Sequence, residues 1–383
     1  MNKFKFSIVC LVFLLGSILS CTKDNSKPDA SSTTVAEDKQ KIGATFDNSL
    51  NCAMQIRDGA FFQAFVKFLD LQNGDVLSEN WIDNLSTELD NVANLNWIDE
   101  NSRFSMNYFS GNYEWNKSAQ SWTKTTNSQV IVNFPSEETQ QSNNCTFKIT
   151  DYSDAPFLVD NETIYLPTSV QANLIKTNSE IFNLNMACTY NSSGFPVPVD
   201  ATITIGLNPF TYTFKIKRLT TTQFEINAGI FSGSDCSTTL YSKISLANDD
   251  YENLDLEQDL NNIQFNYKKG DINISGTWDA KTYNSLYDPT TDQLNSTLNF
   301  VVNYNSQKIG DLRFKDVGSE RELFIYYKDG TSENTSLYYD PFYSDFKAMC
   351  KPYFGDFNKK SVSKYFLNRK IINLKSKISG WFK

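Results

Sequence analysis

Apolar side chains recur at helical spacing in the region from residue 48 to residue 103. One stripe occupies positions i, i+4, i+7 and i+8 and consists of Phe61, Phe65, Phe68 and Leu69. A second stripe follows Ser78, a residue type favoured at helix N-caps, and consists of Trp81, Ile82, Leu85, Leu89 and Val92. The pattern predicts a helical N-terminal lobe over residues 48–103, with an aromatic face that packs on a sheet.

The period changes to two between residues 104 and 357. A representative run is Phe182, Leu184, Met186, Cys188 and Tyr190, each separated by one intervening residue. Turn dipeptides such as Asn208-Pro209, Lys269-Gly270 and Asp329-Gly330 separate such runs. Across the turn at Asp329-Gly330, we expect a strand over residues 323–327 to face Leu337 and Tyr339. This alternation is typical of antiparallel strands with one buried face. The predicted fold class is therefore mainly β (α+β), with a large, curved antiparallel sheet over residues 104–357.

The first 20 residues have the pattern of a secretory signal peptide. Lys3 and Lys5 precede an apolar run over residues 6–19, which is shorter than the ~20 residues of a membrane-spanning helix. The run ends in Ile18-Leu19-Ser20-Cys21, which resembles a bacterial lipobox. This resemblance implies cleavage before Cys21 and acylation of its sulfur, with residues 21–47 as a lipidated flexible tether. The alternatives are a secreted protein with an incidental Cys21, or a retained N-terminal helix.

Two further resemblances concern location and family. Lys23-Asp24 after the acylated cysteine is similar to the surface-export signal of Bacteroidota lipoproteins, which favours the cell surface over the periplasmic side of the outer membrane. Residues 113–116 (YEWN), 122–124 (WTK), 130–135 (VIVNFP) and 309–312 (IGDL) resemble uncharacterised Bacteroidota lipoproteins. That resemblance implies a β-rich body over most of residues 50–357 and carries no catalytic residues.

Composition excludes several kinds of chemistry. The chain of 383 residues contains no histidine, which rules out Ser-His-Asp and Cys-His catalysis and His-ligated zinc. Its formal net charge of -9 argues against nucleic-acid binding, which relies on clustered Lys and Arg. No phosphate-binding or dinucleotide glycine motif occurs, so we predict no cofactor and no catalytic residue.

The cysteines are too widely spaced to form a thiolate metal cluster, and no metal site is predicted. Beyond Cys10 and Cys21, the chain contains Cys52, Cys145, Cys188, Cys236 and Cys350. An exported protein can form disulfides, and Cys188 with Cys236 is the predicted pair because both lie in strand-like runs. The alternative is that these cysteines are small buried hydrophobic residues.

Two groups of residues suggest ligand binding. Tyr113, Trp115 and Trp122 could stack on sugar rings, although aromatic cross-strand pairs are also ordinary sheet stabilisers. Six acids between residues 249 and 259 could hold Ca²⁺, but their spacing differs from the EF-hand loop and favours a solvated linker. Paired carboxylates could hydrolyse glycosides without histidine, but the sequence does not single out two of its 44 acids.

The C-terminal segment, residues 358–383, reads as a basic amphipathic helix. It carries eight Lys or Arg and no acid, and its apolar residues follow helical spacing: Leu367, Ile371, Leu374, Ile378 and Trp381. Two interpretations remain open for residues 359–383. The helix can dock on the acidic protein body, or it can lie on an anionic membrane surface.

Three functional hypotheses follow. The first is a lipid-anchored, non-enzymatic envelope protein that binds or carries a lipidic or glycan ligand. The second is a histidine-free glycan hydrolase that uses paired carboxylates. The third is a structural surface adhesin. A wide apolar cavity between the Phe-rich helix and the sheet would favour a lipid carrier, whereas a packed core would argue against it.

Overall fold

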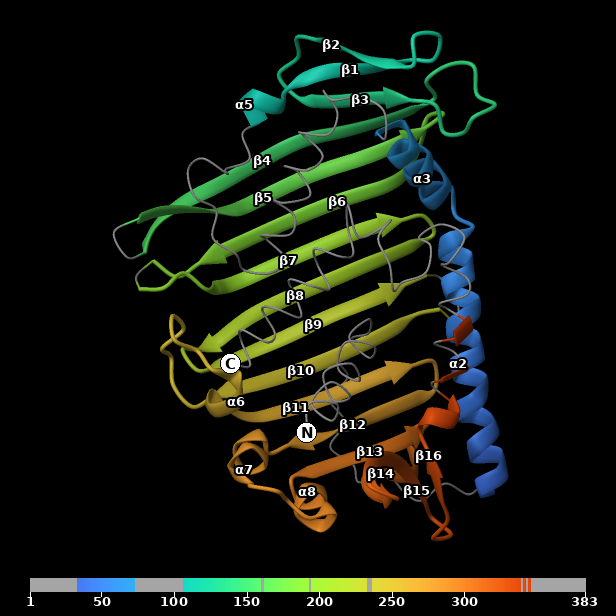
Figure 1. Cartoon of the computed structure of the whole chain (residues 1–383), viewed down its shortest axis with the longest axis vertical. Coiled ribbons are helices and arrows are strands. Elements are labelled where there is room, and N and C mark those ends of the chain that lie inside the picture. The colour runs from blue at the N-terminus through green and yellow to red at the C-terminus, as the bar shows by residue number, and fades with distance from the viewer. Residues whose placement is uncertain are drawn as a thin grey trace. The chain divides into compact units, whose positions relative to one another are not determined.

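The computed structural model describes residues 33–72, 106–159, 162–192, 194–232 and 236–338, with 340–341 and 344–345. The predicted mainly β class is confirmed, because sixteen strands form one open, mixed sheet (Figure 1). Consecutive strands are neighbours from β3 to β16, and β1 lies between β3 and β2. The chain separates into two compact units. Among the described residues, unit 1 comprises 33–53 and 212–345, and unit 2 comprises 54–211.

Unit 2 contains two helices and seven strands. The helices are α3 (Ala60–Gln72) and the short α5 (Met106–Phe109). The strands are β1 (Gly111–Asn116), β2 (Ser121–Thr125), β3 (Val130–Phe134), β4 (Cys145–Val159), β5 (Glu162–Lys176), β6 (Ser179–Tyr190) and β7 (Pro198–Leu207). Neighbouring strands from β1 to β7 pair antiparallel, except β1 with β3, which run parallel.

The core of unit 2 lies between α3 and one face of its strands. Phe61 of α3 stacks on Phe182 of β6 with ring centroids 5.0 Å apart. The ring centroid of Phe68 lies 4.9 Å from that of Phe134 on β3. Both rings pack against a buried cluster that includes Val130 and Val132. Phe61 and Phe68 of the predicted aromatic stripe therefore pack on the sheet as expected, and their rings occupy the described interface between α3 and the strands.

Unit 1 contains the remaining strands and most of the long helix α2 (Val35–Arg57). The strands are β8 (Phe210–Thr220), β9 (Gln223–Phe231), β10 (Thr238–Leu246), β11 (Leu260–Lys269), β12 (Ile272–Trp278), β13 (Leu298–Tyr304), β14 (Gln307–Val317), β15 (Glu320–Tyr327) and β16 (Ser332–Asn334). Short helices α6 (Leu256–Asp259), α7 (Ala280–Ser285) and α8 (Thr291–Ser296) lie in the connections. Lys269-Gly270 forms the predicted turn between β11 and β12.

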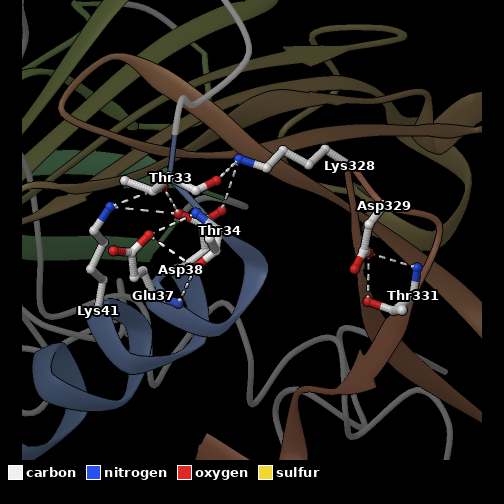
Figure 2. A network of polar contacts seen from close by, with 8 residues as sticks. All are labelled: Thr33, Thr34, Glu37, Asp38, Lys41, Lys328, Asp329 and Thr331. Atoms are coloured by element: carbon white, nitrogen blue, oxygen red, sulfur yellow. Dashed lines mark hydrogen bonds and ion pairs between the residues drawn. The ribbon is translucent and has the colours of Figure 1, made fainter.

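Helix α2 is attached to the strands of unit 1 at three levels. Its start is fixed by a polar network with the β15–β16 turn, which Figure 2 shows. Its middle buries Ile42 against a cluster that includes Val302 and Ile309. Near the end of its unit 1 portion, Cys52 forms a disulfide with Cys236.

The start of α2 has a clear local cause. Thr34 and Glu37 form a capping box: the Thr34 backbone N–H donates to the Glu37 carboxylate at 2.7 Å, and the Glu37 N–H donates to Thr34 Oγ1 at 3.3 Å. Glu37 and Asp38 also place negative charge in the first turn, where the helix dipole favours it. The helix therefore begins at Val35, and the prediction of a flexible tether up to residue 47 is wrong from that point on.

Two other sequence-based predictions need correction. Leu337 was expected on a strand facing residues 323–327, but β16 ends at Asn334 and residues 336–338 are helical. The turn-back after Asp329-Gly330 is real but short, with Phe324 opposite Asn334 as its last pair. The sheet is also not wholly antiparallel, because β1 and β3 are parallel neighbours.

Several predictions fall on residues outside the described ranges and stay predictions. These are the signal peptide over 1–20, the acylated Cys21, the second helix after Ser78, and the basic helix over 358–383. Among the described residues, no helix is long and apolar enough to cross a membrane.

Candidate ligand-binding pocket

The aromatic residues proposed for sugar stacking lie in the core of unit 2. Tyr113, Trp115 and Trp122 are each only 8 % exposed. Trp115 is the cross-strand partner of Trp122, and their rings meet edge to face with centroids 5.2 Å apart. Stacking on a sugar requires an open ring face, so the prediction that these three rings bind ligand is not supported. Their positions fit the alternative, cross-strand stabilisation of the sheet.

The opposite face of the same strands carries a polar row. Because side chains alternate along a strand, Glu114 points away from Tyr113 and Trp115. In the sheet register, Glu114 lies beside Thr123 of β2 and Asn133 of β3, and Asn133 lies beside Thr146 of β4. One polar side chain from each of four adjacent strands is therefore aligned across this face.

Glu114 is the centre of a hydrogen-bonded network of side-chain amides. Asn133 Nδ2 donates to Glu114 Oε1 at 2.7 Å, and Asn112 Nδ2 donates to the same oxygen at 3.2 Å. Asn143 Nδ2 donates to Glu114 Oε2 at 3.0 Å and to the carbonyl of Trp115 at 3.1 Å. Thr146 Oγ1 in turn donates to Asn133 Oδ1 at 2.7 Å. These bonds fix the carboxylate and amides in one arrangement before any ligand arrives.

The loop from residue 135 to residue 144 forms the other wall. Ser136 and Asn144 hold its ends together, because the Ser136 N–H donates to Asn144 Oδ1 at 2.8 Å. Lys117 fixes the loop's middle by donating from Nζ to the carbonyls of Glu138 and Gln140, at 2.9 and 3.1 Å. Lys67 of α3 pairs with the Glu138 carboxylate and fixes the loop from a second side.

Strands and loop together line an open pocket of about 370 Å³. This volume lies at the lower end of the range of small-molecule sites. The lining is mostly polar and comprises Glu114, Trp115, Asn116, Lys117, Ser118, Thr123, Pro135, Gln140, Gln141, Ser142 and Asn143. It contains one carboxylate and one ammonium group among amides and hydroxyls, which suits a neutral ligand rich in hydroxyl groups.

Comparisons with known proteins add no family to this picture. No protein-family model matches the chain, and neither a curated protein nor a solved structure matches it significantly. The resemblance to Bacteroidota lipoproteins therefore rests on sequence motifs alone, and the pocket has to be interpreted from its own chemistry.

The cysteines are arranged differently from the prediction. Cys236 is bonded to Cys52 of α2, and Cys188 is a buried free thiol, so the predicted Cys188–Cys236 pair is wrong. Burial raises the pKa of the Cys145 thiol to about 11 and also raises the pKa of Cys188. A thiol with a raised pKa is a poor nucleophile at neutral pH, which fits these two residues as core side chains.

Among the described side chains of the acidic run over residues 249–259, none takes part in a metal centre. Asp249, Asp250 and Glu252 are exposed, while Asp259 accepts a hydrogen bond from the Asn248 amide and binds the Asp255 N–H. Among the residues that the structure describes, no group of three or more acidic or cysteine side chains is arranged to hold a metal ion.

Sequence reasoning missed the residues that build the pocket. It selected the apolar members of the run at residues 113–116 and passed over Glu114, which alternates with them. Asn133 was visible as the polar residue within 130–135, but its position beside Glu114 depends on the parallel pairing of β1 with β3. Asn143 comes from a loop, and no local pattern indicates where its amide points.

Proposed function

We propose that this chain is a lipid-anchored envelope protein that binds a short, hydroxyl-rich glycan in the Glu114 pocket. The observation that carries this proposal is the fixed set of amides around one carboxylate at the wall of a polar pocket. Sugar hydroxyls both donate and accept hydrogen bonds, so they match a lining that offers carboxylate oxygens, amide groups and the Lys117 ammonium.

The unused hydrogen-bonding capacity of the pocket supports this choice. Glu114 Oε2 accepts one hydrogen bond, from Asn143, so a lone pair remains, and Lys117 uses two of its three N–H groups on loop carbonyls. A sugar hydroxyl could donate to Glu114 and accept from Lys117. An apolar acyl chain would offer no partner to this remaining lone pair and N–H group, which is costly.

The alternatives receive less support. A paired-carboxylate hydrolase needs two acids about 5–9 Å apart, and the lining of this pocket supplies Glu114 alone. A lipid carrier needs an apolar cavity, whereas the described interface between α3 and the strands of unit 2 is occupied by rings such as Phe61, Phe68 and Phe182. No specific observation favours an adhesin.

Anchoring through Cys21 is the part of the proposal that concerns location. It is supported by the signal-like residues 1–20 and by the Cys52–Cys236 disulfide, a bond that persists in oxidising compartments. Substitution Cys21→Ser should move the protein from the membrane fraction into the soluble fraction. Unchanged fractionation, with no acyl label on the wild type, would contradict the anchor.

Glycan binding can be tested with an immobilised glycan array. Fluorescently labelled intact protein should bind a limited set of oligosaccharides, and Glu114→Gln should abolish this signal. The exposed acid Glu320 provides a matched control, and Glu320→Gln should bind like the wild type. Absence of binding to every glycan on the array, or binding by Glu114→Gln as strong as that of the wild type, would contradict the proposal.

A further inference from the structure

A second cluster of reactive groups lies in unit 1, where α2 meets the strands. The Cys52–Cys236 disulfide joins residues 184 positions apart in the chain. Its two cysteines are 6 % and 3 % exposed, and beside them lies Lys269, the last residue of β11, which is itself 3 % exposed. A lysine is rarely buried to this extent, so its position next to a disulfide calls for an explanation.

Lys269 contacts both cysteines of this bond. Its Nζ lies 3.7 Å from Cys52 Sγ and 3.4 Å from the backbone carbonyl oxygen of Cys236. The Cys236 carbonyl also accepts a hydrogen bond from Thr238 Oγ1 at 3.2 Å. The side-chain nitrogen of Lys269 therefore contacts the sulfur of Cys52 and the main chain of Cys236.

A positive charge beside a sulfur favours its thiolate form. In thiol–disulfide exchange, the sulfur that leaves more readily is the one with the more stable thiolate, and the incoming thiol becomes bonded to the other sulfur. Lys269 thus biases this bond in one direction. Cys52 is the leaving sulfur, and Cys236 is the sulfur that is attacked.

We propose that the Cys52–Cys236 bond is a thiol-exchange site at which Cys236 accepts an external thiol while Lys269 holds Cys52 as the departing thiolate. The attacking thiolate forms a new S–S bond to Cys236 Sγ, the Cys52–Cys236 bond breaks, and its electron pair stays on Cys52 Sγ. With a monothiol such as glutathione the mixed disulfide on Cys236 persists. With a dithiol, its second thiolate attacks its own sulfur in the mixed disulfide and expels Cys236 as a thiolate, so the dithiol is oxidised and both cysteines are reduced.

Exchange would have a structural consequence for α2. The disulfide holds the Cys52 end of the helix, whereas the other end is held independently by the pairs Asp38–Lys328 and Lys39–Glu333. Opening the bond removes this attachment and leaves the polar pairs and the contacts of Ile42 in place. Because Cys52, Cys236 and Lys269 are all buried, exchange requires a local opening that admits a thiol to Cys236 while Cys52 stays beside Lys269, and exchange should therefore be slow.

The test uses the intact protein, incubated with a fixed mixture of reduced and oxidised glutathione and then quenched and alkylated. Peptide mass spectrometry should find glutathione on Cys236 and the alkyl group on Cys52. Glutathione mainly on Cys52, or no mixed disulfide at any glutathione ratio, would overturn the proposal.

Substitution of the lysine provides the second measurement. Lys269→Met should lower the rate at which the disulfide opens several-fold, because the departing Cys52 thiolate loses its neighbouring charge. Lys268→Met is the matched control, because Lys268 is the exposed neighbour on the same strand, and it should behave like the wild type. If Lys269→Met does not fold, Lys269→Arg keeps the charge and should retain the preference for Cys236. Opening of Lys269→Met equal to that of the wild type, or loss of the preference in Lys269→Arg, would overturn the proposal.

Discussion

Asp38, on the first turn of α2, and Lys328, after strand β15, form an ion pair in which Lys328 Nζ lies 3.7 Å from Asp38 Oδ2 (Figure 2). Asp38 is completely buried, and its other oxygen accepts a hydrogen bond from Thr33 Oγ1 and lies 3.6 Å from Lys41 Nζ. Lys328 also donates to the carbonyl of Thr33. The start of α2 is thus fixed to the β15–β16 turn by the buried Asp38 carboxylate, which has two cationic neighbours.

The first prediction concerns this ion pair. Asp38→Asn should destabilise the protein by about 2–3 kcal/mol, because it removes the negative charge that pairs with Lys41 and Lys328 and places an amide in a buried site. Urea unfolding followed by circular dichroism measures the difference. Asp47→Asn, at an exposed position of the same helix, is the control and should change stability by less than about 0.5 kcal/mol. Equal stability of the two variants would show that the pair does not hold α2.

The second prediction concerns pH. Hydrogen bonds from the backbone N–H and then the hydroxyl of Thr34 hold the pKa of Glu37 below its ordinary value of 4.5. A carboxyl whose pKa is lowered by folding stabilises the folded state above its unfolded pKa, and this contribution is lost as the pH falls through the folded value. Glu37→Gln should therefore be less stable than the wild type at pH 7, and the difference should disappear well below pH 4.5.

Thermal unfolding at neutral and acidic pH measures this difference. The matched control is Glu320→Gln on β15, whose side chain is exposed and whose substitution should change stability little. A Glu37→Gln difference that is as large in acid as at pH 7 would mean that the capping carboxylate does not act through its charge.

The third prediction uses two glycines of unit 1. A Cβ atom at Gly276 of β12 would lie 1.8 Å from the carbonyl oxygen of Asn299 on β13, so Gly276→Ala requires the strands to separate and should cost about 3 kcal/mol or more. Gly43 lies inside α2 with no atom within 4 Å of an added Cβ. Gly43→Ala should stabilise the protein by about 0.5–1 kcal/mol, because alanine loses less backbone entropy on folding.

Denaturant unfolding of both alanine variants tests the strand pairing directly. The free energy of unfolding should fall in Gly276→Ala and rise in Gly43→Ala. If Gly276→Ala were tolerated as well as Gly43→Ala, β12 and β13 would not approach as closely as the structure indicates.

The sequence predicted those features that depend on local periodicity. The alternating runs around Phe182 and Ile272 became β6 and β12, and the helical stripe that begins at Phe61 became α3. Local patterns did not indicate the start of α2, because residues 35–47 are polar and look like a linker. That helix depends on the capping box at Thr34 and on tertiary anchors such as the disulfide at Cys52, which joins positions far apart in the sequence.

The residues of the candidate site were also hard to predict, because their positions depend on contacts between distant parts of the sequence. Tyr113 and Trp115 attracted attention because exposed aromatic rings bind sugars, but a sequence does not show which face of a strand is covered. Burial of these rings places Glu114 on the other face, and the parallel neighbour β3 supplies Asn133. Both facts follow from the order of strands in the sheet, which is a non-local property.

The central claim is that the Glu114 pocket binds a glycan, and isothermal titration calorimetry with an oligosaccharide selected on the array tests it most directly. Asn143→Ala removes an amide that orients the carboxylate and should weaken binding at least tenfold, the equivalent of about 1.4 kcal/mol. Asn299→Ala, at an exposed position on β13, should leave the dissociation constant unchanged. Equal affinities of wild type, Asn143→Ala and Asn299→Ala would show that the sugar binds elsewhere and would contradict the account.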